Sequence, residues 1–188
     1  MTYPHEKHRE KAPPQLRFAF VTVSTSRYNA KLRGETVEDE SFQVAAKLLS
    51  QRGFPVVAYK LVPDSPRHIL HALAELVSRQ DVDVIIFSGG TGPAPSDVTV
   101  SVLRGAFEKE LEGFGDVFRL VSFFDVSSSA FLSSATAGVL NGKAIFCLPG
   151  SPIAVEKALR NLIMPEAGHL VGLIRESSHG ETYERGHG

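Results

Sequence analysis

The feature that most constrains this chain is a predicted buried strand that runs directly into a glycine-rich turn. Residues 82–88 read VDVIIFS, and residues 89–92, which follow at once, read GGTG. A tight turn needs one or two glycines, so a third indicates that something approaches the backbone closely. A carboxylate, Asp97, follows five residues beyond this turn. The pattern favours an α/β fold with a ligand site at the end of a strand.

The rest of the chain alternates apolar, β-branched segments with segments of helical periodicity. Such alternation predicts a three-layer α/β/α domain with a mostly parallel sheet and helices on both faces. Residues 25–39 are polar and aperiodic, and we expect them to form a long loop. Strands are predicted at residues 16–24, 55–62, 82–88 and 143–149, and helices at 40–53, 65–80, 99–107, within 112–124, and over 151–174 with a break near Pro165.

Length and composition indicate one domain with polar ends. The chain has 188 residues, a formal net charge of -1 and one cysteine. We expect a flexible arm over residues 1–15, a packed body over 16–173 and a polar tail over 174–188. The near-neutral charge favours no nucleic-acid partner, and a single cysteine suits the reducing cytoplasm. No apolar run approaches the roughly 20 residues of a membrane helix.

Four loops of the predicted sheet share an edge. In a parallel sheet, every strand-to-helix connection leaves from the same edge, where ligands bind. Residues 24–27, 63–64, 89–97 and 149–152 are therefore expected to gather there. They offer hydroxyl groups, unobstructed backbone N–H groups and a predicted helix N-terminus, which suit a phosphate-bearing ligand. GGTG matches neither the P-loop nor the G-x-G-x-x-G fingerprint, so a tight turn without a ligand is the alternative.

Two carboxylates, Asp64 and Asp97, follow neighbouring strands of the predicted sheet and are expected at this edge. Beside a phosphate they would repel the ligand unless a cation lay between them, and Mg²⁺ prefers carboxylate and phosphate oxygens. Each Asp also precedes a predicted helix. Helix capping is therefore the alternative for each one taken singly.

Weaker candidates lie outside these loops. His68 and His71, three residues apart on a predicted helix, suit either a metal without an evident third ligand or a solvated face. Cys147 lies in an apolar strand and is expected to be a packed thiol. Aromatic residues within 112–124 are expected in the core or at an oligomer contact, and Arg119 among them suits an anion or an acidic partner.

Seven segments together resemble the MoaB/MogA family of molybdenum cofactor biosynthesis proteins, most closely the MoaB branch. The resemblance covers about residues 17–170. It rests on VTVSTSRY, EDES, LVPD, SGGTGPAPSDVT, GFGDVFRLVSF, ATAGV and FCLPGSPIAV, in this order along the chain.

The resemblance implies a molybdopterin-binding-like fold, a homotrimer or homohexamer, and an activity. Active members use Mg²⁺ and ATP to adenylylate molybdopterin, and the product passes to a molybdate-insertion enzyme. The residues that match the family's catalytic pair are Asp64 and Asp97, which would also hold Mg²⁺. The residues that match its ligand-binding loops are Ser24, Ser26, Gly89, Gly90, Thr91, Gly92, Pro149, Gly150 and Ser151.

Three positions depart from the family pattern. Ser96 and Ser134 stand where arginines are frequent, and Phe42 stands where glycine is usual. Two missing arginines remove about two charge-assisted contacts to an anion. A molybdopterin-binding or scaffold protein without catalysis is therefore the alternative function. The cationic residues suggested as replacements for the arginines are Lys31, Arg33 and Arg104.

Overall fold

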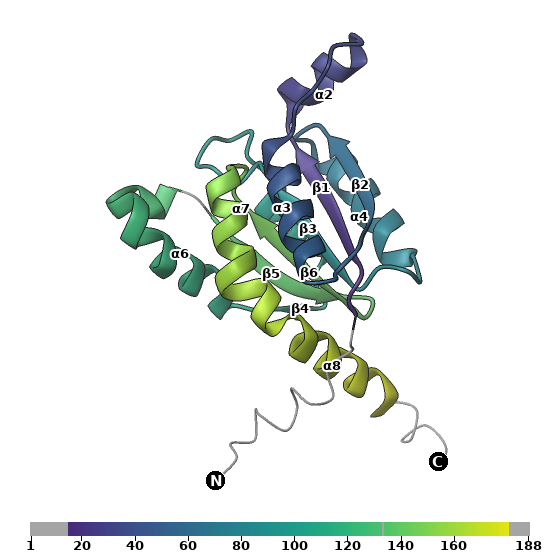
Figure 1. Ribbon diagram of the computed structural model, residues 1–188. Helices are drawn as coiled ribbons and strands as arrows, with labels where there is room; N and C mark the ends of the chain where they lie inside the picture. Colours follow the sequence, from purple (N-terminus) through teal and green to yellow (C-terminus); the bar gives the residue numbers. More distant parts are fainter. Residues whose placement is uncertain (1–14, 133, 181–188) are drawn as a thin grey trace.

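The computed structural model describes residues 15–132 and 134–180. The predicted arm, apart from Gln15, and residues 181–188 of the predicted tail lie outside the described residues. The described chain forms one six-stranded sheet with the strand order β2-β1-β3-β6-β5-β4 (Figure 1). The strands are β1 (Phe18–Val23), β2 (Val56–Val62), β3 (Val84–Ser88), β4 (Lys109–Glu110), β5 (Thr136–Leu140) and β6 (Lys143–Leu148).

The four strands expected from the sequence form the parallel part of the sheet. β1 pairs with β2 and β3, and β3 pairs with β6, all in parallel. β5 and β4 extend the sheet in antiparallel fashion and were not expected. β5 and β6 form a hairpin whose turn residues, Asn141 and Gly142, have φ angles of 48° and 69°. Asn-Gly is the sequence typical of such a turn.

Helices cover both faces of the sheet, as the alternation predicted. One hydrophobic core joins the sheet to α3, α6, α7 and α8, and another joins it to α4 and α5. In Figure 1, α3 and α7 lie in front of the sheet. The helices are α2 (Thr25–Leu32), α3 (Glu40–Gln51), α4 (Pro66–Ser78), α5 (Thr99–Ala106), α6 (Gly113–Val126), the 3₁₀ segment η1 (Ser127–Leu132), α7 (Pro152–Ala158), the π-helical segment η2 (Leu159–Ile163) and α8 (Met164–Gly180).

The central strands are apolar throughout because both of their faces are covered. In β1, Phe18 and Phe20 face one core, while Ala19 and Val21 face the other. Side chains of a strand alternate between the faces of a sheet. A continuous apolar run is therefore the expected pattern for a strand between two helical layers.

The region after β1 corrects the predicted long loop. Residues 25–32 form the helix α2, which projects from the body at the top of Figure 1. The hydroxyl of Ser24 accepts a hydrogen bond from the backbone N–H of Arg27 and caps the helix. None of the helix residues is buried. Hydrophobic periodicity records burial rather than helicity, so this exposed helix left no apolar stripe in the sequence.

The C-terminal region is helical beyond the predicted boundary. α7, η2 and α8 follow one another without a gap, and the π-helical segment precedes Pro165. Proline has no N–H to donate to the preceding turn, and a π-bulge is one way in which a helix accommodates that loss. α8 continues past residue 173, and Ile174 is buried in the core. A polar tail beginning at residue 174 is therefore wrong for the first residues of that range.

An ion-paired carboxylate anchors the opposite, amino-terminal edge of the sheet. Asp83 precedes β3 and is 3% exposed. It accepts hydrogen bonds from the backbone and guanidinium of Arg17, at 2.8 and 3.0 Å, and one from Arg175 at 2.7 Å. Burial alone would raise its pKa, but the bonds and charge of Arg17, aided by Arg175, lower the pKa overall. The network ties β1, β3 and α8 together.

Candidate active site

Backbone hydrogen bonds bring the predicted loops together at the carboxyl edge of the sheet. The N–H of Ser24 donates to the carbonyl of Val62, at 2.9 Å, where β1 and β2 end. The N–H of Gly89 donates to the carbonyl of Leu148, at 3.0 Å, where β3 and β6 end. The four connections that were expected to share an edge therefore do so.

The GGTG loop requires its glycines. Gly89 and Gly90 have φ angles of 111° and 63°, in a region that residues with a side chain rarely adopt. A Cβ at Gly89 would also collide with the carbonyl oxygen of Val23. Three glycines predicted that some group approaches this loop closely. At Gly89, that group is the backbone carbonyl of Val23.

The two aspartates flank this loop. A Cβ built on Gly90 would lie 2.6 Å from Oδ2 of Asp64, and one built on Gly92 would lie 2.6 Å from Oδ2 of Asp97. Both carboxylates therefore occupy space that a side chain on the loop would fill. Gly90, Gly92 and both aspartates remain partly exposed, so an outside ligand can reach the four of them.

Neither aspartate caps the helix that it precedes. Oδ1 of Asp64 accepts from the N–H of Val98, at 3.4 Å, before α5 rather than α4. Oδ2 of Asp97 accepts from the N–H of Ala94, at 3.0 Å, within the loop. The N-cap residues of α4 and α5, Ser65 and Val98, make no side-chain cap hydrogen bond. The capping alternative is therefore not what the structure shows.

Asp64 is a partly buried carboxylate whose pKa is raised. Burial is the main cause, and the neighbouring charge of Asp97 adds to it, while the N–H of Val98 and the hydroxyl of Thr99 oppose it. Within residues 15–132 and 134–180, neither Asp64 nor Asp97 makes an ion pair. Two uncompensated carboxylates at one loop favour a bound cation.

The hydroxyl of Thr99 is the third oxygen of this cluster. Thr99 is fully buried, and a Cβ on Gly90 would meet both its Oγ1 and the Asp64 carboxylate. Although the hydroxyl lowers the pKa of Asp64, its geometry falls short of a hydrogen bond, and Oγ1 has no partner in the described part of the chain. A buried polar atom without a partner is rare in proteins.

The first loop adds hydroxyl groups beside Asp64. Oγ1 of Thr25 accepts from the backbone N–H of Asp64 at 3.0 Å. The hydroxyl oxygens of Ser24 and Ser26 lie 3.3 Å apart. The start of α2 is therefore attached to the backbone of Asp64, the residue whose carboxylate lies against Gly90 of the glycine loop.

The PGSP loop is held from a helix that sequence reasoning did not connect with the site. Ser151 caps α7 by accepting from the N–H of Ala154, at 3.2 Å, as the predicted helix start required. Ser41 in α3 donates its hydroxyl to the carbonyl of Gly150, at 2.8 Å. A Cβ on Gly150 would lie 3.3 Å from the Cα of Gly89, so the two loops touch. Ser41 thus holds the PGSP loop, which in turn contacts the GGTG loop.

Asp39 fixes the start of α3 and so the position of Ser41. It is buried, and its carboxylate accepts from the N–H of Phe42 at 3.0 Å and from the hydroxyls of Tyr59, at 2.7 Å, and Thr22. Sequence reasoning did not assign Asp39 a role. The signal was present, because an aspartate before an apolar helical stripe is a typical N-cap.

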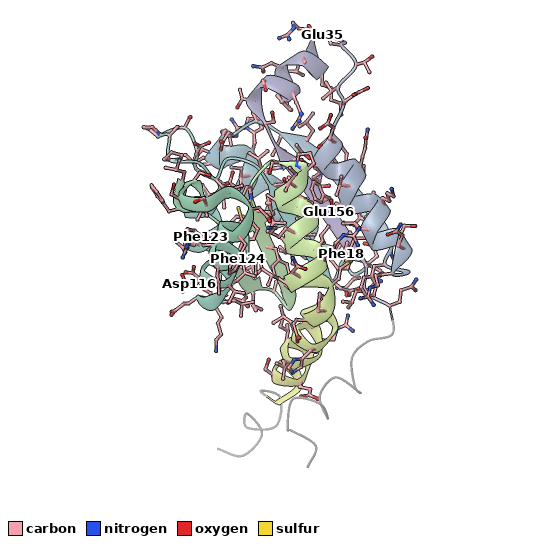
Figure 2. The ribbon with its side chains drawn as sticks, turned by 60° about the vertical axis from the view of Figure 1, so that its left-hand side comes forward. Phe18, Glu35, Asp116, Phe123, Phe124 and Glu156 are labelled. Atoms are coloured by element: carbon pink, nitrogen blue, oxygen red, sulfur yellow. The ribbon has the colours of Figure 1, made fainter. Side chains whose placement is uncertain are left out.

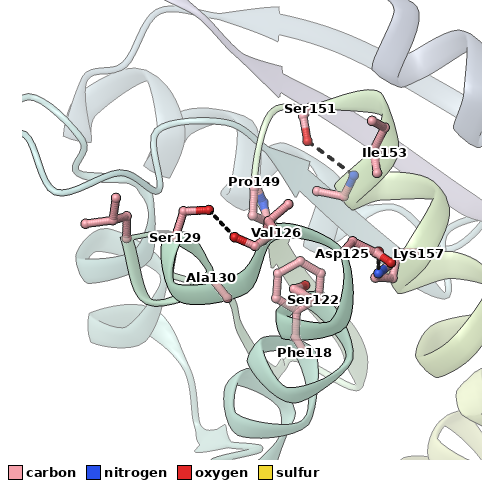
Figure 3. Close-up of a pocket in the computed structure, with 12 residues that line it drawn as sticks. Phe118, Ser122, Asp125, Val126, Ser129, Ala130, Pro149, Ser151, Ile153 and Lys157 are labelled. Atoms are coloured by element: carbon pink, nitrogen blue, oxygen red, sulfur yellow. Dashed lines mark hydrogen bonds and ion pairs between the residues drawn. The ribbon is translucent and has the colours of Figure 1, made fainter.

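A cavity of about 370 Å³ borders the PGSP loop (Figure 3). Phe118, Val126 and Ile153 give it apolar walls, and Lys157 lies at its side. Lys157 is ion-paired with Asp125 and donates to the carbonyl of Val121 at 3.0 Å. Sequence reasoning missed this cavity because its walls combine α6 and η1 with α7, which begins 20 residues after η1 ends.

The positions that depart from the family pattern have local explanations. Phe42 packs between Phe20 and Tyr59, with ring centroids 5.7 and 4.1 Å away, and fills space that glycine would leave. Ser96 is exposed, and Ser134 donates its backbone N–H to Thr91 at 2.9 Å. The hydroxyl groups at both positions replace guanidinium groups without adding charge.

Of the three cations suggested as replacements, two are engaged elsewhere. Arg33 pairs with Glu35, and Arg104 pairs with Glu110 at 2.7 Å. Lys31 makes no ion pair within the described ranges. Of the three, Lys31 is therefore the one whose charge no acidic side chain compensates in the described part of the chain.

The structure also shows the surroundings of the weaker candidate residues. Cys147 is fully buried, and burial raises the pKa of its thiol, so the packed-thiol prediction is confirmed. Arg119 pairs with Asp116. His68 and His71 are exposed, and among the described residues no three His, Cys, Asp or Glu side chains gather as a metal site. In the same ranges, no helix is long and apolar enough to cross a membrane.

The geometry defines an α/β domain with a candidate ligand site, in which a glycine loop lies between two carboxylates at the carboxyl edge of the sheet. Residues 19–169 match the family model described as a probable molybdopterin binding domain. The chain belongs to this family, as the resemblance of its motifs predicted.

Three relatives show how close the similarity is. A protein of Methanocaldococcus jannaschii named probable molybdopterin adenylyltransferase is 42% identical over 161 residues, which are 86% of this chain and 95% of that protein. Molybdenum cofactor biosynthesis protein B of Halalkalibacterium halodurans is 40% identical over 168 residues, 88% and 94% of the two chains. A crystal structure of a molybdenum cofactor biosynthesis protein B superposes with a TM-score of 0.79, at 35% identity, and covers 88% of this chain and 99% of that one.

Proposed function

We propose that this chain is a molybdopterin adenylyltransferase of molybdenum cofactor biosynthesis. It transfers AMP from ATP to the terminal phosphate of molybdopterin and releases pyrophosphate. The observation that carries the proposal is the placement of Asp64 and Asp97 around the GGTG loop, without a cationic partner in the described part of the chain. The names of relatives at about 40% identity support the substrates.

The cluster fits a magnesium ion. Mg²⁺ binds through one or two carboxylates together with substrate phosphates, and this cluster offers two carboxylates and the unpartnered hydroxyl of Thr99. Asp64 and Asp97 would hold the ion. When bound, Mg²⁺ supplies the charge that compensates the phosphates.

The protein's own groups have two tasks in the transfer. A molybdopterin phosphate oxygen forms a bond to the α-phosphorus of ATP, and the bond from that phosphorus to the β-phosphate oxygen breaks. The attacking phosphate is already ionised near neutral pH, so the aspartates serve the metal and need not take a proton. Alignment of the two substrates and compensation of their charge are what remains for the site to supply.

The two glycine-containing loops and the first loop bind different groups of the ligand. We assign the backbone N–H groups of Gly90, Thr91 and Gly92 and those of Gly150 and Ser151 to phosphate oxygens. Pro149 shapes the second loop, and its carbonyl accepts from Ser88 at 3.3 Å. Gly89 provides the turn that presents the GGTG loop. Ser24 and Ser26 supply hydroxyl groups beside Asp64.

An apolar surface on α6 and η1, continued by Ile153 of α7, fits an interface between copies of the chain. Phe124 is 79% exposed and Phe131 is 73% exposed, and Figure 2 shows Phe123 and Phe124 on the outside of α6. Large exposed apolar patches mark interaction sites. A homotrimer or homohexamer would cover this surface, and substitution of Phe124 by Ser would then lower the mass measured by light scattering.

The adenylylated molybdopterin would then be passed to a molybdate-insertion enzyme.

The direct test incubates the full chain with molybdopterin, Mg²⁺ and ATP and follows both pyrophosphate and the adenylylated pterin. We expect both products in equal amounts. Binding of molybdopterin and ATP in a calorimeter without either product would support the non-catalytic binding protein instead. The substitutions at Ser96 and Ser134, which remove two family arginines, are the observation that favours this second candidate.

A further inference from the structure

A second cavity lies along the free edge of the sheet. It measures about 330 Å³, and α2, the edge strand β2 and α4 form its walls. We call it the α2–α4 groove. Its polar and charged lining residues are Tyr28, Lys31, Tyr59, Lys60, His68 and His71.

One end of the groove adjoins the candidate active site. Val62 lines the groove, and Asp64 follows two residues later. Thr25, whose Oγ1 accepts from the N–H of Asp64 at 3.0 Å, lies one helical turn before Tyr28. Tyr28 in turn contacts His68, with ring centroids 6.1 Å apart. The face of α2 that touches Asp64 therefore continues directly into the groove.

The groove carries positive charge that the protein leaves uncompensated. Lys31 is exposed and makes no ion pair within residues 15–132 and 134–180. His68 and His71, three residues apart, lie on one side of α4. Glu75, one helical turn beyond His71 on α4, is ion-paired with Lys60 at 2.6 Å. A flexible ammonium group and two imidazoles that line the same groove suit a mobile phosphate group.

We propose that the α2–α4 groove binds the β- and γ-phosphates of ATP and holds them as the pyrophosphate leaving group. This inference rests on the proposed adenylyl transfer and adds the part of the site that receives the product. When the bond between the α-phosphorus and the bridging oxygen breaks, its electron pair leaves with pyrophosphate. Negative charge therefore grows on that group, and cations placed there stabilise the transition state.

The position of the groove explains how the site functions without two arginines. The GGTG and PGSP loops offer N–H groups but no cationic side chain. In the groove next to Asp64, Lys31 supplies a positive charge, and the imidazoles of His68 and His71 supply N–H donors. One wall of the groove is the exposed helix α2, so pyrophosphate can leave without movement of the core.

Binding of inorganic pyrophosphate to the full chain tests the inference without the transfer reaction. The variants are Lys31→Ala and the triple variant Lys31→Ala/His68→Gln/His71→Gln, measured by calorimetry with Mg²⁺. We expect Lys31→Ala to weaken pyrophosphate binding about fivefold, the upper range for an exposed charge contact. The triple variant is expected to lose about tenfold or more, with unchanged affinity for molybdopterin.

Lys47→Ala is the matched control, because Lys47 is an exposed helical lysine on α3, outside the groove. It should leave pyrophosphate binding unchanged. If the triple variant binds pyrophosphate as tightly as the wild type while both adenylylate molybdopterin, the groove is not the phosphate site and the proposed function stands. If the wild type binds neither ATP nor pyrophosphate, the proposed function itself fails. A zinc ion that binds the wild type but not the triple variant, with pyrophosphate binding unaltered, would identify a metal site instead.

Discussion

The two edges of the sheet each hold a buried or half-buried aspartate, and the protein treats the two in opposite ways. At the amino edge, Asp83 accepts hydrogen bonds from two arginines, Arg17 and Arg175, and its pKa is lowered. At the carboxyl edge, burial and the neighbouring carboxylate of Asp97 raise the pKa of Asp64. The first arrangement stabilises the fold. The second leaves a charge to be compensated by a ligand, as sites of function commonly do.

The largest effect is expected from removing a charge at the carboxyl edge. Asp64→Asn or Asp97→Asn should lower the adenylylation rate about 100-fold or more, because charge compensation is the main contribution of such a site. The melting temperature should not fall. Asp116→Asn, at an exposed surface pair, is the control for loss of one carboxylate. Full activity in both site variants would falsify the metal role.

The same change at the amino edge should act on stability alone. Asp83→Asn removes the charge that pairs with Arg17 and should lower the free energy of unfolding by about 2 kcal/mol, the scale of a hydrogen bond to a charged group. Urea titration measures this loss. The activity of the remaining folded molecules should equal that of the wild type. The neighbouring surface pair provides a control, since Asp81→Asn should leave the midpoint of the urea titration nearly unchanged.

The two edges should also respond to pH with opposite sign. The stability contributed by Asp83 is fully present above the ordinary aspartate pKa of about 3.9 and is lost as pH falls through its lower folded value. Asp64 has the raised pKa, so its ionised form disfavours folding at neutral pH. Asp64→Asn should therefore raise the melting temperature at pH 7, and this gain should vanish in acid. Scanning calorimetry of both variants at pH 7 and in acid checks the sign; a gain that grew on acidification would contradict it.

The smallest effect is expected from removing an uncharged hydrogen bond at the carboxyl edge. Ser41→Ala removes the bond to the carbonyl of Gly150 and should cost about 1 kcal/mol of stability. If Ser41 positions the ligand loops, kcat should fall by several-fold and Ser41→Thr should restore it. A loss of stability with unchanged kcat would make Ser41 a structural residue only, like those around Asp83.

Sequence patterns predicted the elements whose side chains are buried. β1, β3 and β6 appeared as apolar runs, and α3 and α4 as apolar stripes, because each packs against the sheet. The carboxyl edge followed from the parallel order, which is why the GGTG loop and its two aspartates could be brought together before the structure was known. Local rules and topology are enough for such features.

Elements without a buried stripe were not predictable in this way. α2 buries nothing, and β4 has only two residues. Contacts made by packing distant helices were also missed: the hydrogen bond from Ser41 to Gly150 joins residues 109 positions apart. Nothing in the local sequence specifies which loop a serine on another helix will meet.

The helix α2 has a consequence for how this protein can change over time. Since none of its side chains belongs to the interior, a mutation in these eight residues faces little selection for folding. The segment nevertheless touches Asp64 and borders the α2–α4 groove. Substrate preference could therefore drift, or be redirected by library screening, within one short surface helix while the rest of the architecture stays intact.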